Sequence, residues 1–217
     1  MSLFRLDASI RFEGSVTRAV ADTVQAAWQV EHPGAPVTRR DLGAAPLPSN
    51  AWPDAIRGRM MPEDAQTAAH REAAALATTL GDELLAAEAY LFAIPLYNFG
   101  VAQNAKVWMD LVLADPRLGP SGDHPLTGRP AVLVTARGGG YGPGTPREGW
   151  DHSTPYLRRF FGDVLGLDVH LAEAELTLAG VNPAMEALRG LAAESLAQAH
   201  VVAEEHGRKV AQLVRAA

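Results

Sequence analysis

The feature that most limits the fold of this chain is residues 89–94, in which every side chain is apolar and which Pro95 ends. A strand that is apolar on both faces fits the centre of a parallel sheet that helices cover on both sides. The segment is also far shorter than the roughly 20 residues that a membrane-spanning helix needs. It therefore predicts a buried central strand of an α/β protein.

Short β-like segments alternate with stretches of helical periodicity along the rest of the chain. This alternation is typical of a mostly parallel sheet with helices on both faces. We expect strands at residues 3–6, 36–41, 89–94, 130–135 and 169–178. We expect helices from the cap Ser15 to about 31, over 63–85, 102–113 and 154–165, and from Asn182 through Leu213. Residues 42–62, rich in proline and alanine, predict an irregular connection.

The composition narrows the class of protein. A length of 217 residues with 47% hydrophobic content fits one globular domain, residues 1–217, better than two. The net charge of -6 offers no broad attraction for nucleic acid or an anionic membrane. The sequence has no cysteine, which excludes disulfides, a thiol nucleophile and cysteine-ligated metal, so redox chemistry would need a bound cofactor. We predict no metal site.

The N-terminal residues predict a cytoplasmic location. Arg5 and Asp7 interrupt the apolar region that a secretory signal peptide would need.

Three loops follow predicted strands at the edge where ligands bind in open parallel sheets, namely residues 7–17, 95–100 and 136–153. The first delivers Ser9, Gly14, Ser15 and Thr17 to the start of a helix, where hydroxyls and free backbone N–H groups favour a phosphate. From this segment alone, a helix cap at Ser15 is the more common explanation. The third loop is long for an α/β connection, which indicates a lid or a binding loop.

The sequence lacks two common nucleotide-binding motifs, the P-loop and the Rossmann fingerprint. Residues 100–107 have the length of a P-loop, but Ala105 replaces its second glycine and Val107 its magnesium-binding hydroxyl, which excludes ATP or GTP there. Residues 138–144 are rich in glycine, yet they do not satisfy G-x-G-x-x-G and do not follow the first strand. A Rossmann dinucleotide site is therefore not expected.

The run Pro-Leu-Tyr-Asn-Phe-Gly at 95–100, followed by Lys-Val-Trp-Met-Asp at 106–110, resembles the FMN-dependent NADH-azoreductases of the flavodoxin-like quinone reductase superfamily. Further motifs match in the same order, at residues 7–9, 14–17, 135–139, 154–157 and 160–162. The resemblance covers nearly the whole chain. It implies a flavodoxin-like three-layer sandwich whose five-stranded parallel sheet has the order 2-1-3-4-5.

The resemblance also implies a site for flavin mononucleotide (FMN), bound without a covalent link. The flavin carries the chemistry, so no catalytic side chain is assigned. Alternative roles are plain packing for Tyr97 and Phe99 and a turn for Asn98. The implied phosphate ligands are Ser9, Ser15, Val16 and Thr17; Leu96, Tyr97, Asn98 and Phe99 lie along the isoalloxazine ring, and Ala136, Arg137, Gly138 and Gly139 approach its other edge.

By the same resemblance, NADH or NADPH reduces the flavin and leaves, and a quinone or azo compound then takes two electrons in a ping-pong cycle. The site forms between two subunits of a homodimer. Candidate aromatic walls are Phe160, Phe161, Tyr141 and Trp150.

The sequence departs from the family pattern in two places. Val16 stands where relatives often have a polar residue, and residues 115–128 lack the aromatic side chains that relatives place near the flavin. The second departure concerns substrate preference, including azo reduction, rather than flavin binding. The alternatives are a flavodoxin-type one-electron carrier, a tetrameric quinone reductase on the same scaffold, and a binding protein with a vestigial cofactor site. Flavodoxin-type carriers favour an acidic rim around the flavin. Arg137 and Arg147, in the long loop, argue against such a rim in this chain.

Overall fold

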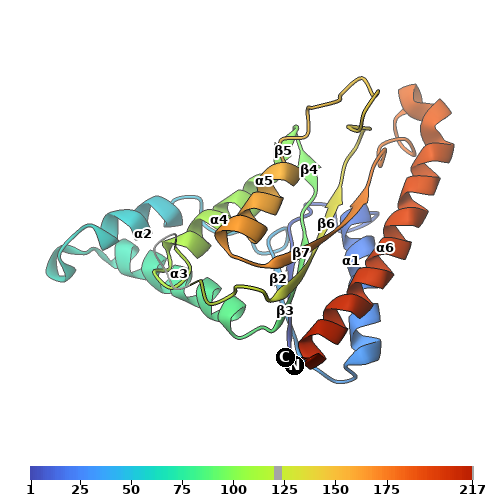
Figure 1. The fold of residues 1–217 in the computed structure, drawn as a ribbon. Coiled ribbons are helices and arrows are strands. Elements are labelled where there is room, and N and C mark those ends of the chain that lie inside the picture. The colour runs from blue at the N-terminus through green and yellow to red at the C-terminus, as the bar shows by residue number, and fades with distance from the viewer. Residues whose placement is uncertain (120–123, 217) are drawn as a thin grey trace.

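The computed structural model describes residues 1–119 and 124–216 and contains a five-stranded parallel sheet in the order β2-β1-β3-β6-β7 (Figure 1). Every neighbouring pair in this sheet is parallel. The strand order confirms the predicted 2-1-3-4-5 topology. The strands are β1 (Leu3–Asp7), β2 (Val37–Asp41), β3 (Ala89–Ala93), β6 (Pro130–Ala136) and β7 (Asp168–Ala174).

Helices cover both faces of the sheet, as predicted (Figure 1). One face packs against α1 (Val16–Glu31) and α6 (Arg189–Ala216). The other packs against α3 (Ala68–Leu85), α4 (Gln103–Ala114) and α5 (Thr154–Arg158). No helix in the described part of the chain is long and apolar enough to cross a membrane.

The central strand β3 shows why its sequence is apolar throughout. Its side chains alternate between the two faces, because successive residues of a strand point in opposite directions. Leu91 packs with the core under α1 and α6, whereas Tyr90 and Phe92 pack with the core under α3 and α4. The ring of Phe161 stacks on that of Phe92 with 3.9 Å between their centroids.

The expectation of an irregular connection over residues 42–62 was wrong, because this segment contains helix α2 (Ala51–Arg59). Pro53 lies in its first turn, where a backbone N–H would have no acceptor within the helix, so the proline is tolerated. Ala51, Ala55 and Gly58 are the buried residues of α2. The next helix begins at Ala68, later than predicted, after a 3-10 turn over Glu63–Ala65.

Three other boundaries differ from prediction. The fifth strand ends at Ala174, and residues 175–178 turn away with Leu176 at φ 59°. Beyond Arg158 the helix continues as a π-helix, η2 (Arg159–Val164). The last helix is preceded by a 3-10 helix, η3 (Pro183–Leu188), which Asn182 caps. These short departures from the predicted boundaries depend on tertiary contacts, which the periodicity of the sequence does not reveal.

Candidate functional site

The loops that follow β1, β3 and β6 meet at the carboxyl end of the sheet and enclose a small pocket. Its volume is about 150 Å3. The segment after β7 closes one side of it. The lining residues are Ser9, Arg11, Ser15, Val16, Thr17, Pro95, Leu96, Tyr97, Ala136, Gly138, Thr177 and Leu178.

Residues 9–17, which we call the phosphate turn, contribute a chain of hydroxyls. The Oγ of Ser15 donates to the Oγ of Ser9 at 2.9 Å. The hydroxyl of Tyr97 lies 3.3 Å from the same Ser9 Oγ and accepts a hydrogen bond from the backbone N–H of Ile10 at 3.2 Å. The phenol of Tyr97 therefore points into the phosphate turn. The predicted position of Tyr97 along the isoalloxazine ring did not include this contact.

The start of α1 gives this pocket its electrostatic character. The Oγ of Ser15 caps the helix by accepting from the N–H of Arg18 at 3.4 Å. No acidic side chain lies in the first turn of α1. The first N–H groups of a helix have no acceptor within it and carry the positive end of the dipole, so an anion is favoured there. Ser15 is thus both a helix cap and a pocket residue.

The loop after β3 forms a tight hairpin beside this pocket. Strands β4 (Leu96–Tyr97) and β5 (Gly100–Val101) pair antiparallel, with Asn98 and Phe99 as the two turn residues. Asn98 has φ 49° and Phe99 has φ 67°. Two positive φ values are typical of a type I′ hairpin turn, but they are unfavourable for a bulky residue such as phenylalanine. Strain of this kind concentrates at functional sites.

Phe99, Tyr141 and Trp150 form an aromatic cluster at the β4–β5 turn. Their rings meet edge to face, at 5.4 Å between Phe99 and Trp150 and 6.5 Å between Phe99 and Tyr141. The guanidinium of Arg147 lies over the Phe99 ring, 5.6 Å from its centroid. The N–H of His152 donates to the carbonyl of Phe99 at 3.0 Å. The long loop after β6 is therefore attached directly to the β4–β5 turn.

Gly138 lets the turn after β6 approach the segment after β7. A Cβ at Gly138 would lie 2.7 Å from the Cδ1 of Leu178, so the side chain of Leu178 would have to shift to make room for it. Backbone hydrogen bonds run from the N–H of Thr177 to Arg137 and from the N–H of Leu178 to Gly138, at 3.1 and 3.2 Å. Leu178 lines the pocket although its side chain is 41% exposed.

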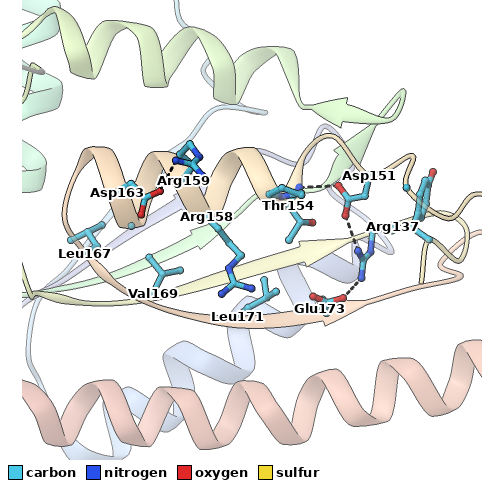
Figure 2. A pocket seen from close by; sticks show the side chains of 14 residues that line it. Arg137, Asp151, Thr154, Arg158, Arg159, Asp163, Leu167, Val169, Leu171 and Glu173 are labelled. Carbon is cyan, nitrogen blue, oxygen red and sulfur yellow. Dashed lines mark hydrogen bonds and ion pairs between the residues drawn. The ribbon is translucent and has the colours of Figure 1, made fainter. Parts of the chain in front are cut away.

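Arg137 directs its side chain away from the pocket and into a second, larger groove of about 750 Å3 between β7 and the α5–η2 segment (Figure 2). There it pairs with Asp151 at 2.7 Å, with Glu175 at 3.3 Å and with Glu173. Burial alone would raise the pKa of Asp151. The N–H groups of Thr154 and Ser153 and the ion pair with Arg137 outweigh it and lower that pKa.

The two phenylalanines proposed as aromatic walls do not reach the site. Phe160 and Phe161 are buried in the core beneath the sheet face that α3 and α4 cover. Trp150, which is 52% exposed, and Tyr141 lie beside Phe99 instead. The sequence did not distinguish these cases, because both pairs of aromatics follow β6 in apolar or glycine-rich surroundings.

The structure brings most of the predicted site residues together, but not all. Asn98 and Phe99 lie at the adjacent turn, and Arg137 and Gly139 do not line the pocket. The predicted site residues did not include Arg11, Pro95, Thr177 and Leu178, which also line the pocket. The position of Thr177 and Leu178 at the carboxyl end of the fifth predicted strand was the signal that could have found them. The predicted residues that line the pocket are Ser9, Ser15, Val16, Thr17, Leu96, Tyr97, Ala136 and Gly138.

Fold and site together define a flavodoxin-like α/β protein with a pocket of clustered hydroxyls and a helix N-terminus at the carboxyl end of its sheet. A family model described as a flavodoxin-like fold matches residues 1–199. A relative from Kineococcus radiotolerans, named FMN-dependent NADH:quinone oxidoreductase, is 39% identical over 211 residues, which cover 95% of this chain and 98% of the relative. A relative of the same name from Parafrankia sp. is 37% identical over 188 residues, or 85% of this chain and 88% of that protein.

The chain belongs to this flavodoxin-like family, whose curated relatives are named FMN-dependent NADH:quinone oxidoreductase. Among solved structures, an azoreductase from Bacillus anthracis str. Sterne has a TM-score of 0.76 at 18% identity, covering 96% of this chain and 99% of that one. An FMN-dependent NADH-azoreductase from the same species, in complex with FMN, has a TM-score of 0.74 at 19% identity, covering 97% and 100%. At these identities the likeness concerns the fold.

Proposed function

We propose that this protein is an FMN-dependent NAD(P)H oxidoreductase that reduces quinones, azo compounds or both by two-electron transfer. The observation that carries the proposal is the pocket between the phosphate turn and Tyr97, which lies beside the strained turn at Asn98 and Phe99. The family relationship points to the same cofactor, because its curated members are named for FMN and NADH.

The pocket fits the phosphate end of FMN. Hydroxyls of Ser9, Ser15 and Tyr97 and the N-terminus of α1 supply neutral donors, which suffice for a phosphate. The pocket of about 150 Å3 is smaller than the roughly 300–1,000 Å3 of a complete small-molecule site. The isoalloxazine ring would therefore lie outside it, along the Asn98–Phe99 turn and the backbone at Gly138 and Gly139.

When bound there, FMN would supply hydride acceptance from NADH or NADPH and two-electron delivery to a quinone or azo compound, in a ping-pong cycle. The chain's own residues would bind and orient it. The aromatic cluster would provide apolar ring contacts beside the flavin for either substrate. The hydride would supply both electrons and one hydrogen, and the proton that completes the reduced acceptor would come from water.

We include in the proposal a homodimer whose interface completes the site. The segments that form or flank the pocket, namely the phosphate turn, the long loop and the segment after β7, carry the exposed apolar side chains Ile10, Phe12, Trp150 and Leu178. Apolar side chains grouped around a site are typical of a surface that a partner covers. A single domain over residues 1–217 and a cytoplasmic location stay predictions.

One anaerobic experiment tests the proposed function. The purified protein, loaded with FMN, is followed by its visible spectrum during addition of NADH or NADPH and then of benzoquinone or an azo dye. Bleaching by the donor and rapid recovery with the acceptor are expected. A protein that takes up no FMN contradicts the proposal. Bleaching too slow for turnover, with ready formation of a one-electron reduced flavin, would instead support the carrier function. Size measurement in solution tests the dimer separately.

A further inference from the structure

Arg18 is bonded to the back of the phosphate turn. Its Nη2 donates to the carbonyl of Ser9 at 2.7 Å, and its Nε donates to the carbonyl of Arg11 at 3.1 Å. Its side chain is 10% exposed. The residue thus fixes two carbonyls on either side of Ile10, whose N–H points toward Tyr97.

Asp41, the last residue of β2, holds this guanidinium in place. The two carboxylate oxygens accept from Nη1 and Nη2 of Arg18 at 2.6 and 2.8 Å. One of these oxygens also accepts from the N–H groups of Gly43 and Ala44, at 3.0 and 3.1 Å. A planar guanidinium is suited to such a two-pronged contact, which sets direction as well as distance.

The turn after β2 is packed against the phosphate turn at this point. A Cβ at Gly43 would lie 2.3 Å from the carbonyl oxygen of Ser9 and 3.0 Å from Nη2 of Arg18. No larger residue fits without moving the backbone of one of the two turns. The conformation of the phosphate turn is therefore determined by β2 as well as by its own residues.

The charge of Arg18 is balanced within the protein. The hydrogen bond from Arg18 is the largest cause that lowers the pKa of Asp41, and it outweighs the opposite effect of burial. The buried carboxylate of Asp7 lies 3.9 Å from Nη1 of Arg18. A paired guanidinium whose hydrogen bonds go to carbonyls and carboxylates has little to offer a phosphate directly. Its contribution is the shape of the turn.

We propose that Arg18 is a positioning residue, which holds residues 9–11 so that the hydroxyl of Ser9, which lines the pocket, faces the phosphate of FMN. The inference rests on the proposed function. Loss of a positioning residue should affect binding differently from a general destabilisation of the fold. Loss of Arg18 should weaken the binding of flavins that carry the phosphate. The binding of riboflavin, which has the same ring without the phosphate, should be unaffected.

The test compares Arg18→Lys with Arg39→Lys in the cofactor-free protein. A lysine keeps the charge but cannot bond Asp41 and two carbonyls at once. Arg39 is the matched control, because it pairs with Asp7 and Asp41 but makes no hydrogen bond to residues 9–11 in the described part of the chain. Dissociation constants for FMN and for riboflavin are measured by quenching of flavin fluorescence, and folding is checked by circular dichroism.

Arg18→Lys is expected to weaken FMN binding by about tenfold or more, as supporting residues do at other ion sites, with riboflavin binding unchanged. Arg39→Lys should change neither. An unchanged ratio of FMN to riboflavin affinity in Arg18→Lys would overturn the inference while the proposed function stands. A wild-type protein that binds no FMN would overturn both. If Arg18→Lys does not fold, Asp41→Asn, which removes the charge that orients Arg18, must show the same selective loss.

Discussion

The hydroxyl of Tyr97 lies 3.3 Å from the Oγ of Ser9, a contact between residues 88 positions apart in the chain. It joins the hairpin that follows β3 to the turn that follows β1. The two loops expected to hold different ends of one ligand are thus linked before any ligand binds. Such a link reduces the ordering that binding would otherwise require.

The first prediction concerns this link. Tyr97→Phe removes the hydroxyl that accepts from the N–H of Ile10 and lies beside Ser9, but keeps the ring. Because one hydrogen bond contributes about 0.5–1.5 kcal/mol net, FMN should bind roughly 2- to 13-fold more weakly. Titration with FMN measures this. Tyr156→Phe, at a tyrosine that is 40% exposed, is the control and should bind FMN as the wild type does. Equal affinities for the two variants would contradict the prediction.

The second prediction concerns the backbone at Phe99. Both Phe99→Ala and Phe99→Gly remove the ring, but only glycine accepts φ 67° without strain. The glycine variant should therefore be more stable than the alanine variant by about 1 kcal/mol, since the left-handed region costs other residues about 1–2 kcal/mol. Denaturation in urea measures the difference. A more stable alanine variant, the usual order outside such turns, would show that the turn is not strained in solution.

The third prediction concerns Arg137, which is 9% exposed and pairs with Asp151, Glu173 and Glu175. Arg137→Met leaves these carboxylates without their shared cation. Because Glu173 is 39% exposed, we expect a loss of about 2 kcal/mol, below the roughly 3–5 kcal/mol of a fully buried pair. Arg158→Met is the control, at an exposed arginine without an ion pair in the described residues. Equal free energies of unfolding for both variants would be inconsistent with the network.

The fourth prediction concerns His170 on β7 and His206 on α6, whose ring centroids lie 5.3 Å apart. Burial is the main cause that lowers the pKa of each below its ordinary value of 6.5. Lys209 lowers both further. Asp168 opposes the shift at His170, and Glu205 and a backbone hydrogen bond with Leu171 oppose it at His206.

A lowered pKa in the folded state means that the unfolded chain takes up protons first as the pH falls. The stability contributed by the neutral pair is therefore complete above pH 6.5 and declines below it, toward the lower pKa of the folded state. Melting temperatures should fall from about pH 7.5 to about pH 5.5, and His206→Gln should reduce this slope. His152→Gln, at an exposed histidine, should keep the wild-type slope. The same slope in all three proteins would contradict the prediction.

Local patterns were sufficient for the layered fold and for the order of its loops. The apolar run at 89–94 predicted a strand buried on both faces, because no other environment accepts apolar side chains in both directions. Ser15 predicted the start of α1, because a cap satisfies backbone donors only a few residues away. These features depend on neighbouring residues, which is why sequence alone reached them.

The orientation of side chains in the site depended on contacts between distant segments. The sequence correctly placed Tyr97 and Arg137 in loops at the carboxyl edge of the sheet. Only the fold decided that the phenol reaches Ser9 and that the guanidinium turns to Asp151. The pairing of Arg18 with Asp41 likewise required β1 and β2 to lie side by side. A sequence pattern predicts which face of its own helix or strand a side chain occupies. The partner of that side chain depends on which other element the packed core brings to that face.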